Sequence, residues 1–133
     1  MAIKKPQIIT IVCNKGGVGR STTCINFAWS LARKRKKVLV CDLDAQANSS
    51  STLAENYNGD VVENGRNITN LLKSSGDGAS DYIVDTRNPK IKLLASTLML
   101  DSTEGEMKSL LDINIFRLFN HFFNRKIKSN FDY

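Results

Sequence analysis

Several residue types are scarce in this chain, and each scarcity excludes a class of protein or site. There is one histidine, His121, and the cysteines are three in number with no C-x-x-C pair, so no zinc-ligand spacing is present. An odd cysteine count in apolar surroundings also argues against a disulfide-stabilised secreted domain. We interpret the cysteines as reduced core residues: Cys13, Cys24 and Cys41.

Long apolar runs are missing as well. None approaches the roughly 18 to 20 residues that a membrane-spanning helix needs, and residues 1–13 contain no small-residue cleavage site of a signal peptide. The 133 residues are the length of one domain. The sequence therefore predicts a single cytoplasmic domain.

Acidic residues are absent from residues 1–40, which hold nine lysines and arginines. Residues 41–112 hold twelve acids against six bases, and the net charge of the chain is +6. Such a balance favours a polyanionic partner, a nucleotide or a nucleic acid. The basic run at residues 33–37 is interpreted first as a solvated helix C-terminus, which the helix dipole favours, with a nucleic-acid patch as the alternative.

What the first 44 residues do contain is the pattern of a βαβ unit. Residues 7–13 form a nearly continuous, β-branched apolar run, which is typical of a central strand buried on both faces. Three glycines follow within residues 14–19, and a helical pattern begins at Ser21. We expect that helix to be buried on more than one side, with Trp29 in the core. A second apolar strand is expected at residues 38–41.

Weaker patterns fill the rest of the chain. Residues 49–67 are polar and predict no element, whereas residues 68–73 predict a short helix and residues 91–95 a strand. Residues 113–127 predict an amphipathic helix with basic residues off its apolar face. Alternating strands and helices predict an α/β fold with a mostly parallel sheet.

A glycine-rich turn between a strand and a helix lets backbone N–H groups point at a phosphate. The general P-loop pattern G-x-x-x-x-G-K-[ST] fails here at two positions, because Asn14 replaces the first glycine and Arg20 replaces the lysine. An arginine keeps the charge, but its planar guanidinium does not reproduce a compact ammonium between two phosphates.

Residues 14–23, Asn-Lys-Gly-Gly-Val-Gly-Arg-Ser-Thr-Thr, closely resemble the deviant Walker A loop of the ParA/Soj/MinD family, whose marker is a lysine before Gly-Gly, here Lys15. Residues 42–48, Asp-Leu-Asp-Ala-Gln-Ala-Asn, resemble that family's next motif at the family spacing. Gln46 and Asn48 favour the partition branch. Weaker similarity continues to residues 130–133.

The resemblance implies a P-loop NTPase of the SIMIBI type, with a parallel sheet and flanking helices. Residues 1–133 would be the N-terminal part of its nucleotide-binding domain, incomplete because the strand with the Walker B aspartate would follow Tyr133. An alternative takes residues 81–86 as that strand, although they lie early and hold few apolar residues.

The resemblance also assigns roles to residues that match the motifs. Lys15 would reach across a nucleotide-sandwich dimer and act in catalysis with Asp44, which would position the attacking water. Asp42 would support the Mg²⁺ shell. The backbone of Gly16, Gly17, Val18 and Gly19 would cradle the phosphates. Ser21 would bind Mg²⁺ through its hydroxyl, Thr22 would contact the α-phosphate, and Arg20 stands in the place of the phosphate-binding lysine.

The expected function is that of a plasmid or chromosome partition ATPase. By resemblance its cofactors are ATP and Mg²⁺, and its partners are a second copy of itself, non-specific DNA and a centromere-binding protein. Two alternatives stay open. Arg20 and the absent Walker B half favour a truncated, non-catalytic relative with weak or no nucleotide binding. By resemblance, the helix at residues 113–127 would precede the Walker B strand and pack on the sheet, and a MinD-like ATPase that uses this helix on a membrane surface is the alternative.

Overall fold

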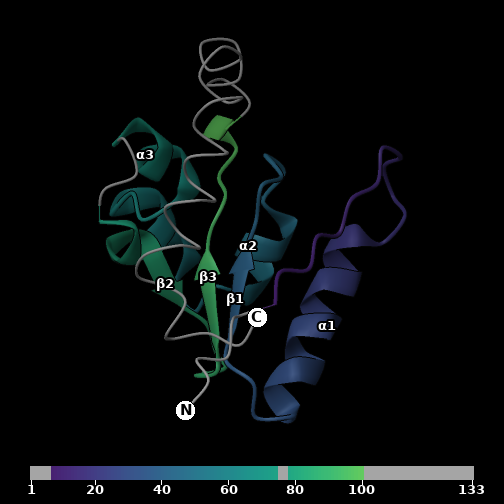
Figure 1. Cartoon of the computed structure of the whole chain (residues 1–133). Helices are drawn as coiled ribbons and strands as arrows, with labels where there is room; N and C mark the ends of the chain where they lie inside the picture. Colours follow the sequence, from purple (N-terminus) through teal and green to yellow (C-terminus); the bar gives the residue numbers. More distant parts are fainter. Residues whose placement is uncertain (1–6, 75–77, 101–133) are drawn as a thin grey trace.

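A small mixed sheet organises the part of the chain that the computed structural model describes, residues 7–74 and 78–100. The strands are β1 (Val38–Cys41), β2 (Ile83–Asp85) and β3 (Ile91–Leu94), in the order β1-β3-β2 (Figure 1). β1 and β3 are parallel, with Val38 opposite Ile91, and β2 runs antiparallel to β3. The α/β prediction and the strands expected at residues 38–41 and 91–95 are therefore confirmed, while β2 makes the sheet mixed.

Five helical segments are described besides the strands. They are α1 (Arg20–Arg33), α2 (Asn48–Leu53) and α3 (Ile68–Lys73), with a π-helix η1 (Tyr57–Glu63) and a 3₁₀ helix η2 (Ala79–Tyr82). α3 has the predicted bounds, and its first turn is capped by Asn67, whose side chain accepts from the N–H of Asn70 at 3.0 Å. The expected helix at residues 113–127 lies outside the described residues.

The prediction that residues 49–67 form no element is wrong. The segment is polar, but α2 and η1 bury single residues that tie it to the sheet, among them Leu53 and Val61. Ser49 and Ser50 are also buried. A hydrophobic pattern cannot reveal a helix whose buried face carries serines.

The core lies on both faces of the sheet because side chains alternate along each strand. On one face, Val40 of β1 and Leu93 of β3 pack with Ala28 and Ala32 of α1. On the other face, Leu94 packs with residues of α3. Figure 1 shows α1 and α3 on opposite sides of the strands.

The predicted central strand at residues 7–13 is not formed. These residues belong to no helix or strand, and their apolar side chains are exposed, 58% for Ile8 and 76% for Val12. A strand needs a neighbour to accept its backbone hydrogen bonds. The three strands of the sheet pair in the order β1-β3-β2, and residues 7–13 belong to none of them.

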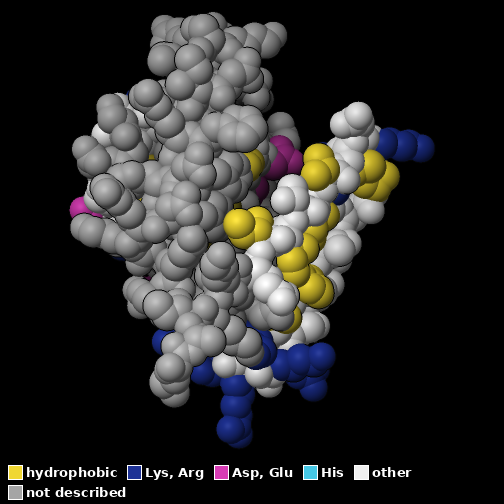
Figure 2. All heavy atoms as spheres, viewed as in Figure 1, with side chains coloured by type: hydrophobic (Ala, Val, Ile, Leu, Met, Phe, Trp, Pro, Cys, Tyr) yellow, Lys and Arg dark blue, Asp and Glu magenta, His cyan; other side chains and the backbone are white. Residues whose placement is uncertain are grey.

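The expected burial of α1 on more than one side is also wrong. Only Ala28 and Ala32 are buried, and Trp29 is 41% exposed rather than in the core. Figure 2 shows hydrophobic side chains uncovered along α1. Because α1 packs on one face of the sheet and no other described element covers its outer side, its second apolar stripe meets solvent.

α1 ends in a Schellman motif. The N–H of Arg35 donates to the carbonyl of Ala32 at 2.9 Å, and the N–H of Lys36 donates to that of Leu31 at 3.1 Å. Arg35 takes the left-handed conformation, φ 62°, where glycine is usual. The turn brings the basic residues 33–37 to the exposed end of the helix.

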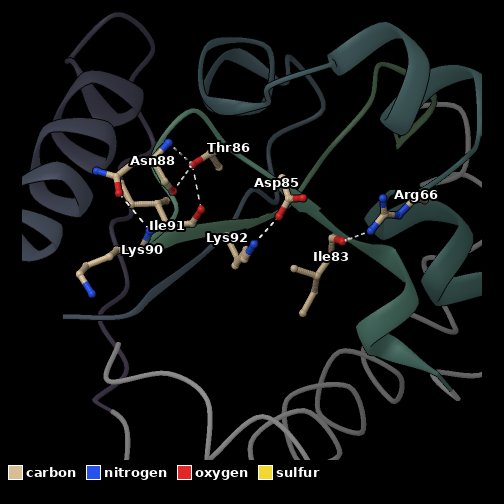
Figure 3. Close-up of polar contacts among 8 residues, drawn as sticks. All are labelled: Arg66, Ile83, Asp85, Thr86, Asn88, Lys90, Ile91 and Lys92. Carbon is tan, nitrogen blue, oxygen red and sulfur yellow. Dashed lines mark hydrogen bonds and ion pairs between the residues drawn. The ribbon is translucent and has the colours of Figure 1, made fainter. Parts of the chain in front are cut away.

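β2 is joined to β3 by a hydrogen-bonded turn (Figure 3). The Thr86 hydroxyl lies 2.8 Å from the carbonyl of Ile91 and accepts from the N–H of Asn88 at 3.1 Å. Asp85 forms an ion pair with Lys92 across the strands, and a hydrogen bond from Lys92 lowers the pKa of Asp85. An exposed carboxylate on an antiparallel edge strand does not fit a Walker B aspartate, so the alternative interpretation of residues 81–86 fails.

Candidate phosphate-binding site

The glycine loop, residues 14–19, is exposed and leads directly into α1. Gly17 and Gly19 have positive φ angles, 72° and 81°, a region that other residues adopt only with strain. A Cβ at either position would meet no atom within 4 Å. The glycines are therefore required by backbone conformation, and the space beside the loop is open to a ligand.

The first turn of α1 presents unsatisfied donors. Gly19 is its N-cap, no side chain caps it, and the first turn carries no acid. The first intrahelical bond runs from the N–H of Thr23 to the carbonyl of Gly19 at 2.8 Å, so the N–H groups of residues 20–22 have no intrahelical partner. Together with the positive end of the helix dipole, they fit an anion such as a phosphate. Ser21 is half-buried and Thr22 exposed on this turn.

Asp42 follows β1 and is buried, and its carboxylate accepts three hydrogen bonds. Its Oδ2 accepts from the backbone N–H of Ser50 at 2.9 Å and from the Ser50 hydroxyl at 2.7 Å. Its Oδ1 accepts from the N–H of Asp44 at 3.1 Å. These contacts fix the Asp42 carboxylate beneath the turn that follows β1.

Ser50 and Ser96 extend this network, and sequence reasoning missed both. The Ser50 hydroxyl accepts from the N–H of Ser96 at 2.8 Å, and both residues are fully buried. Ser50 thus ties α2 to the end of β1 and to the segment after β3. The sequence offers one hint, a run of three serines that follows the aspartate motif of residues 42–48. That run is compatible with α2, but it does not say which residue Ser50 contacts.

Asp44 lies at the surface of the same turn and pairs with the first residue of α1. Its Oδ1 accepts from the N–H of Gln46 at 3.0 Å, and its Oδ2 lies 3.7 Å from Nη2 of Arg20. The two side chains are 38% and 40% exposed. The structure therefore brings together one residue from each of the two motifs, at the end of the sheet where α1 begins (Figure 1).

The other residues of the loop are open to solvent. Lys15 is exposed on the loop, as are Gly16 and Val18. Among the described residues, no group of three or more His, Cys, Asp or Glu side chains is arranged to hold a metal ion. Ser21 carries a hydroxyl, and Asp42 and Asp44 carry carboxylates, which are oxygen donors of the type that Mg²⁺ prefers.

Two cysteines lie near Asp42, and neither is set up for chemistry. Burial, with smaller contributions from Cys24 and Asp42, raises the pKa of the Cys41 thiol from 9.0 to about 12. Burial and the Asp42 charge also raise the pKa of Cys24. A thiol with a raised pKa is a poor nucleophile at neutral pH, which agrees with a core role for both.

In the described ranges, no helix has the length and apolar character needed to cross a bilayer.

Comparison with known proteins matches this geometry to one family. The family model described as an AAA domain, AAA_31, covers residues 6–133. The sporulation initiation inhibitor protein Soj of Bacillus subtilis is 30% identical over 129 residues, which are 96% of this chain and 47% of Soj. The chromosome partitioning protein ParA of Myxococcus xanthus is 43% identical over 72 residues, half of this chain and a quarter of that protein.

Solved structures agree with this match. A plasmid partition protein from Borrelia burgdorferi superposes with a TM-score of 0.62 at 35% identity, covering 87% of this chain and 52% of that one. A Borrelia burgdorferi plasmid partition protein bound to AMPPNP gives a TM-score of 0.64 at 35% identity, covering 87% and 50% of the two chains. The chain thus spans about half the length of Soj and of these solved proteins.

Proposed function

This chain belongs to the AAA domain family and, within it, to the ParA and Soj type of P-loop ATPase, and from that premise we propose that it binds Mg·ATP and acts as an ATP-dependent dimer switch in plasmid or chromosome partition. The observation that carries the proposal is the approach of Asp44 to the first residue of α1, at 3.7 Å from Arg20. A phosphate-binding turn and a carboxylate for the reacting end of the nucleotide then share one surface.

Different residues would bind the nucleotide, position the attacking water and support the site. The backbone of residues 16–19 and the first N–H groups of α1 bind the phosphates, and Ser21 offers its hydroxyl to the ion that accompanies them. Asp44 holds the attacking water, and Asp42 keeps the turn in place. Bound ATP supplies the phosphoanhydride bond to be broken, and Lys15 contacts the nucleotide of the second subunit.

DNA and a centromere-binding protein are the proposed partners. ParA and the Borrelia proteins are named for partition. The basic run at residues 33–37, exposed except at the half-buried Lys36, offers charge for phosphate contacts that carry no sequence information. The proposed location is the cytoplasm, on the nucleoid when the dimer holds DNA.

A second candidate, nucleotide binding with little or no turnover, is favoured by one observation. The guanidinium of Arg20 pairs with the carboxylate that would hold the water, and it cannot place charge between the phosphates as a lysine does. We expect Arg20→Lys to raise ATP turnover about tenfold, the effect of roughly 1.4 kcal/mol of better charge placement. The rate of phosphate release measures the turnover. Arg33→Lys, at the far end of α1, is the control and should leave the turnover unchanged. Unchanged turnover in Arg20→Lys would show that Arg20 is not what limits hydrolysis.

Thermal unfolding with and without Mg·ATP tests the binding step, because a ligand that binds only the folded state raises its stability. At a hundred times its dissociation constant, the nucleotide adds about 2.7 kcal/mol. The shift should shrink in Ser21→Ala and persist in Ser30→Ala, where the exposed hydroxyl donates only to the carbonyl of Asn26. No shift in the unsubstituted chain would refute nucleotide binding.

A further inference from the structure

We propose that Arg20 and Asp44 form an exchangeable latch, in which the guanidinium leaves the Asp44 carboxylate for the phosphates when nucleotide binds. Asp44 then sets the affinity of the loop for nucleotide in addition to any part in hydrolysis. The inference rests on the proposed function and identifies Asp44 as a positioning residue for Arg20.

The acidic half of the latch is fixed in place. Asp44 is held through both backbone and side chain: its N–H donates to Asp42, and its Oδ1 accepts from Gln46. Asp42 is anchored in turn by Ser50, whose hydroxyl is bonded to the backbone of Ser96. The chain of contacts leaves Oδ2 of Asp44 as the oxygen that faces Arg20.

The basic half is the part that moves. Arg20 is the first residue of α1, its side chain is 40% exposed, and its guanidinium pairs with Asp44. Its backbone belongs to the turn whose N–H groups face the phosphate position. One guanidinium cannot neutralise Asp44 and a phosphate at the same time, so the two anions compete for it.

The strength of the pair suits exchange. Ion pairs between exposed side chains contribute about 0.2 to 1 kcal/mol, whereas a phosphate chain carries several charges in one place. The pair therefore weakens nucleotide binding without preventing it. Breaking it should tighten binding by roughly 1.4-fold to fivefold, which is that energy range expressed as a ratio of dissociation constants.

A double-mutant cycle on the full chain tests the latch. Dissociation constants for a fluorescent N-methylanthraniloyl ATP with Mg²⁺ are measured for the unsubstituted protein, Asp44→Asn, Arg20→Ala and the double variant. The amide introduced by Asp44→Asn keeps an oxygen for the N–H of Gln46, so the turn is retained. We expect Asp44→Asn to tighten binding within the range above when Arg20 is present, and to have a smaller effect when it is absent.

The controls separate the latch from general electrostatics and from the proposed function. Asp81→Asn removes an exposed carboxylate away from the loop and should leave the dissociation constant unchanged. An equal effect of Asp44→Asn with and without Arg20, or weaker binding in Asp44→Asn, overturns the latch while nucleotide binding stands. Failure of the unsubstituted chain to bind the analogue overturns both.

Discussion

Ser50 is the residue on which the geometry of the site depends most. It is fully buried and bonds to the Asp42 carboxylate twice, through its N–H and its hydroxyl, while its oxygen accepts from Ser96. Hydrogen bonds to charged groups contribute more than neutral ones, and a buried group left without its partner costs further. The small hydroxyl of Ser50 therefore joins α2 to two strand ends.

We predict that Ser50→Ala lowers the free energy of unfolding by about 1.5 to 3 kcal/mol, because it takes one hydrogen bond from the Asp42 carboxylate and leaves the Ser96 N–H without a bonding partner. Urea denaturation followed by circular dichroism measures the loss. Ser51→Ala on the same helix removes an exposed hydroxyl that reaches only the carbonyl of Asn48 and should change stability by less than about 0.5 kcal/mol. Equal losses in the two variants would contradict the network.

Cys41 gives the protein a pH dependence at the alkaline end. Its pKa is raised to about 12 in the folded chain, whereas in the unfolded chain the thiol ionises near its ordinary value of 9.0. Between those values the folded state binds more protons, so stability falls as pH rises, by up to about 1.4 kcal/mol per pH unit. Urea denaturation curves measured from pH 8 to 11 should give a free energy of unfolding that falls as the pH rises. Cys41→Ala should remove the part of this fall that Cys41 causes. If the free energy of unfolding falls with pH as steeply in Cys41→Ala as in the unsubstituted chain, then Cys41 has the same pKa in the folded and unfolded states.

At the scale of elements, the end of α1 carries a conformational cost. Arg35 occupies the left-handed position of a Schellman motif with φ 62°, at a cost of roughly 1 kcal/mol for a residue with a side chain. We predict that Arg35→Gly raises the free energy of unfolding by about 0.5 to 1 kcal/mol. Lys34→Gly, at φ −81°, should bring no gain. Thermal unfolding of both variants measures these changes. A lower stability of Arg35→Gly would show that the Arg35 side chain stabilises the fold by more than its left-handed backbone destabilises it.

Elements were predictable where local chemistry and pattern agree. α3 has a capping asparagine before an apolar pattern, and β1 and β3 are short apolar runs next to polar turns, so each was placed from sequence. Residues 7–13 carry a stronger strand pattern than either, yet they form none, because pairing depends on a neighbour and not on the run itself. The positions of Asp42 and Asp44 at the end of β1 were foreseen, whereas the Ser50 to Ser96 contact joins residues 46 apart and leaves no local signal.

At the scale of the molecule, the described residues distribute their apolar surface unevenly between the core and the solvent. The core residues on both faces of the sheet are buried, but residues 8–12 and the outer side of α1 expose large apolar side chains. Contiguous exposed apolar area is uncommon on soluble domains and promotes association. The unpaired edge of β1 among the described residues adds to that tendency.

We predict that Val12→Ser leaves the free energy of unfolding within about 0.5 kcal/mol and reduces self-association, because Val12 is 76% exposed. Leu93→Ala, at a fully buried position, should cost about 2 to 5 kcal/mol. Urea denaturation and light scattering at several concentrations provide the two readouts. A large loss of stability in Val12→Ser would mean that residues 7–13 are buried in solution.

The exposure of Trp29 turns α1 into a built-in optical probe. It is the single tryptophan of the chain, it lies on the outer side of the helix that begins at the phosphate loop, and it is 41% exposed. The fluorescence emission of Trp29 should lie at longer wavelength than that of a buried tryptophan. Iodide should quench it readily, because the basic residues 33–37 attract this anion. Any polypeptide that covers this side of α1 should shift the emission to the blue and protect it from iodide, so occupancy of that surface can be followed without a label.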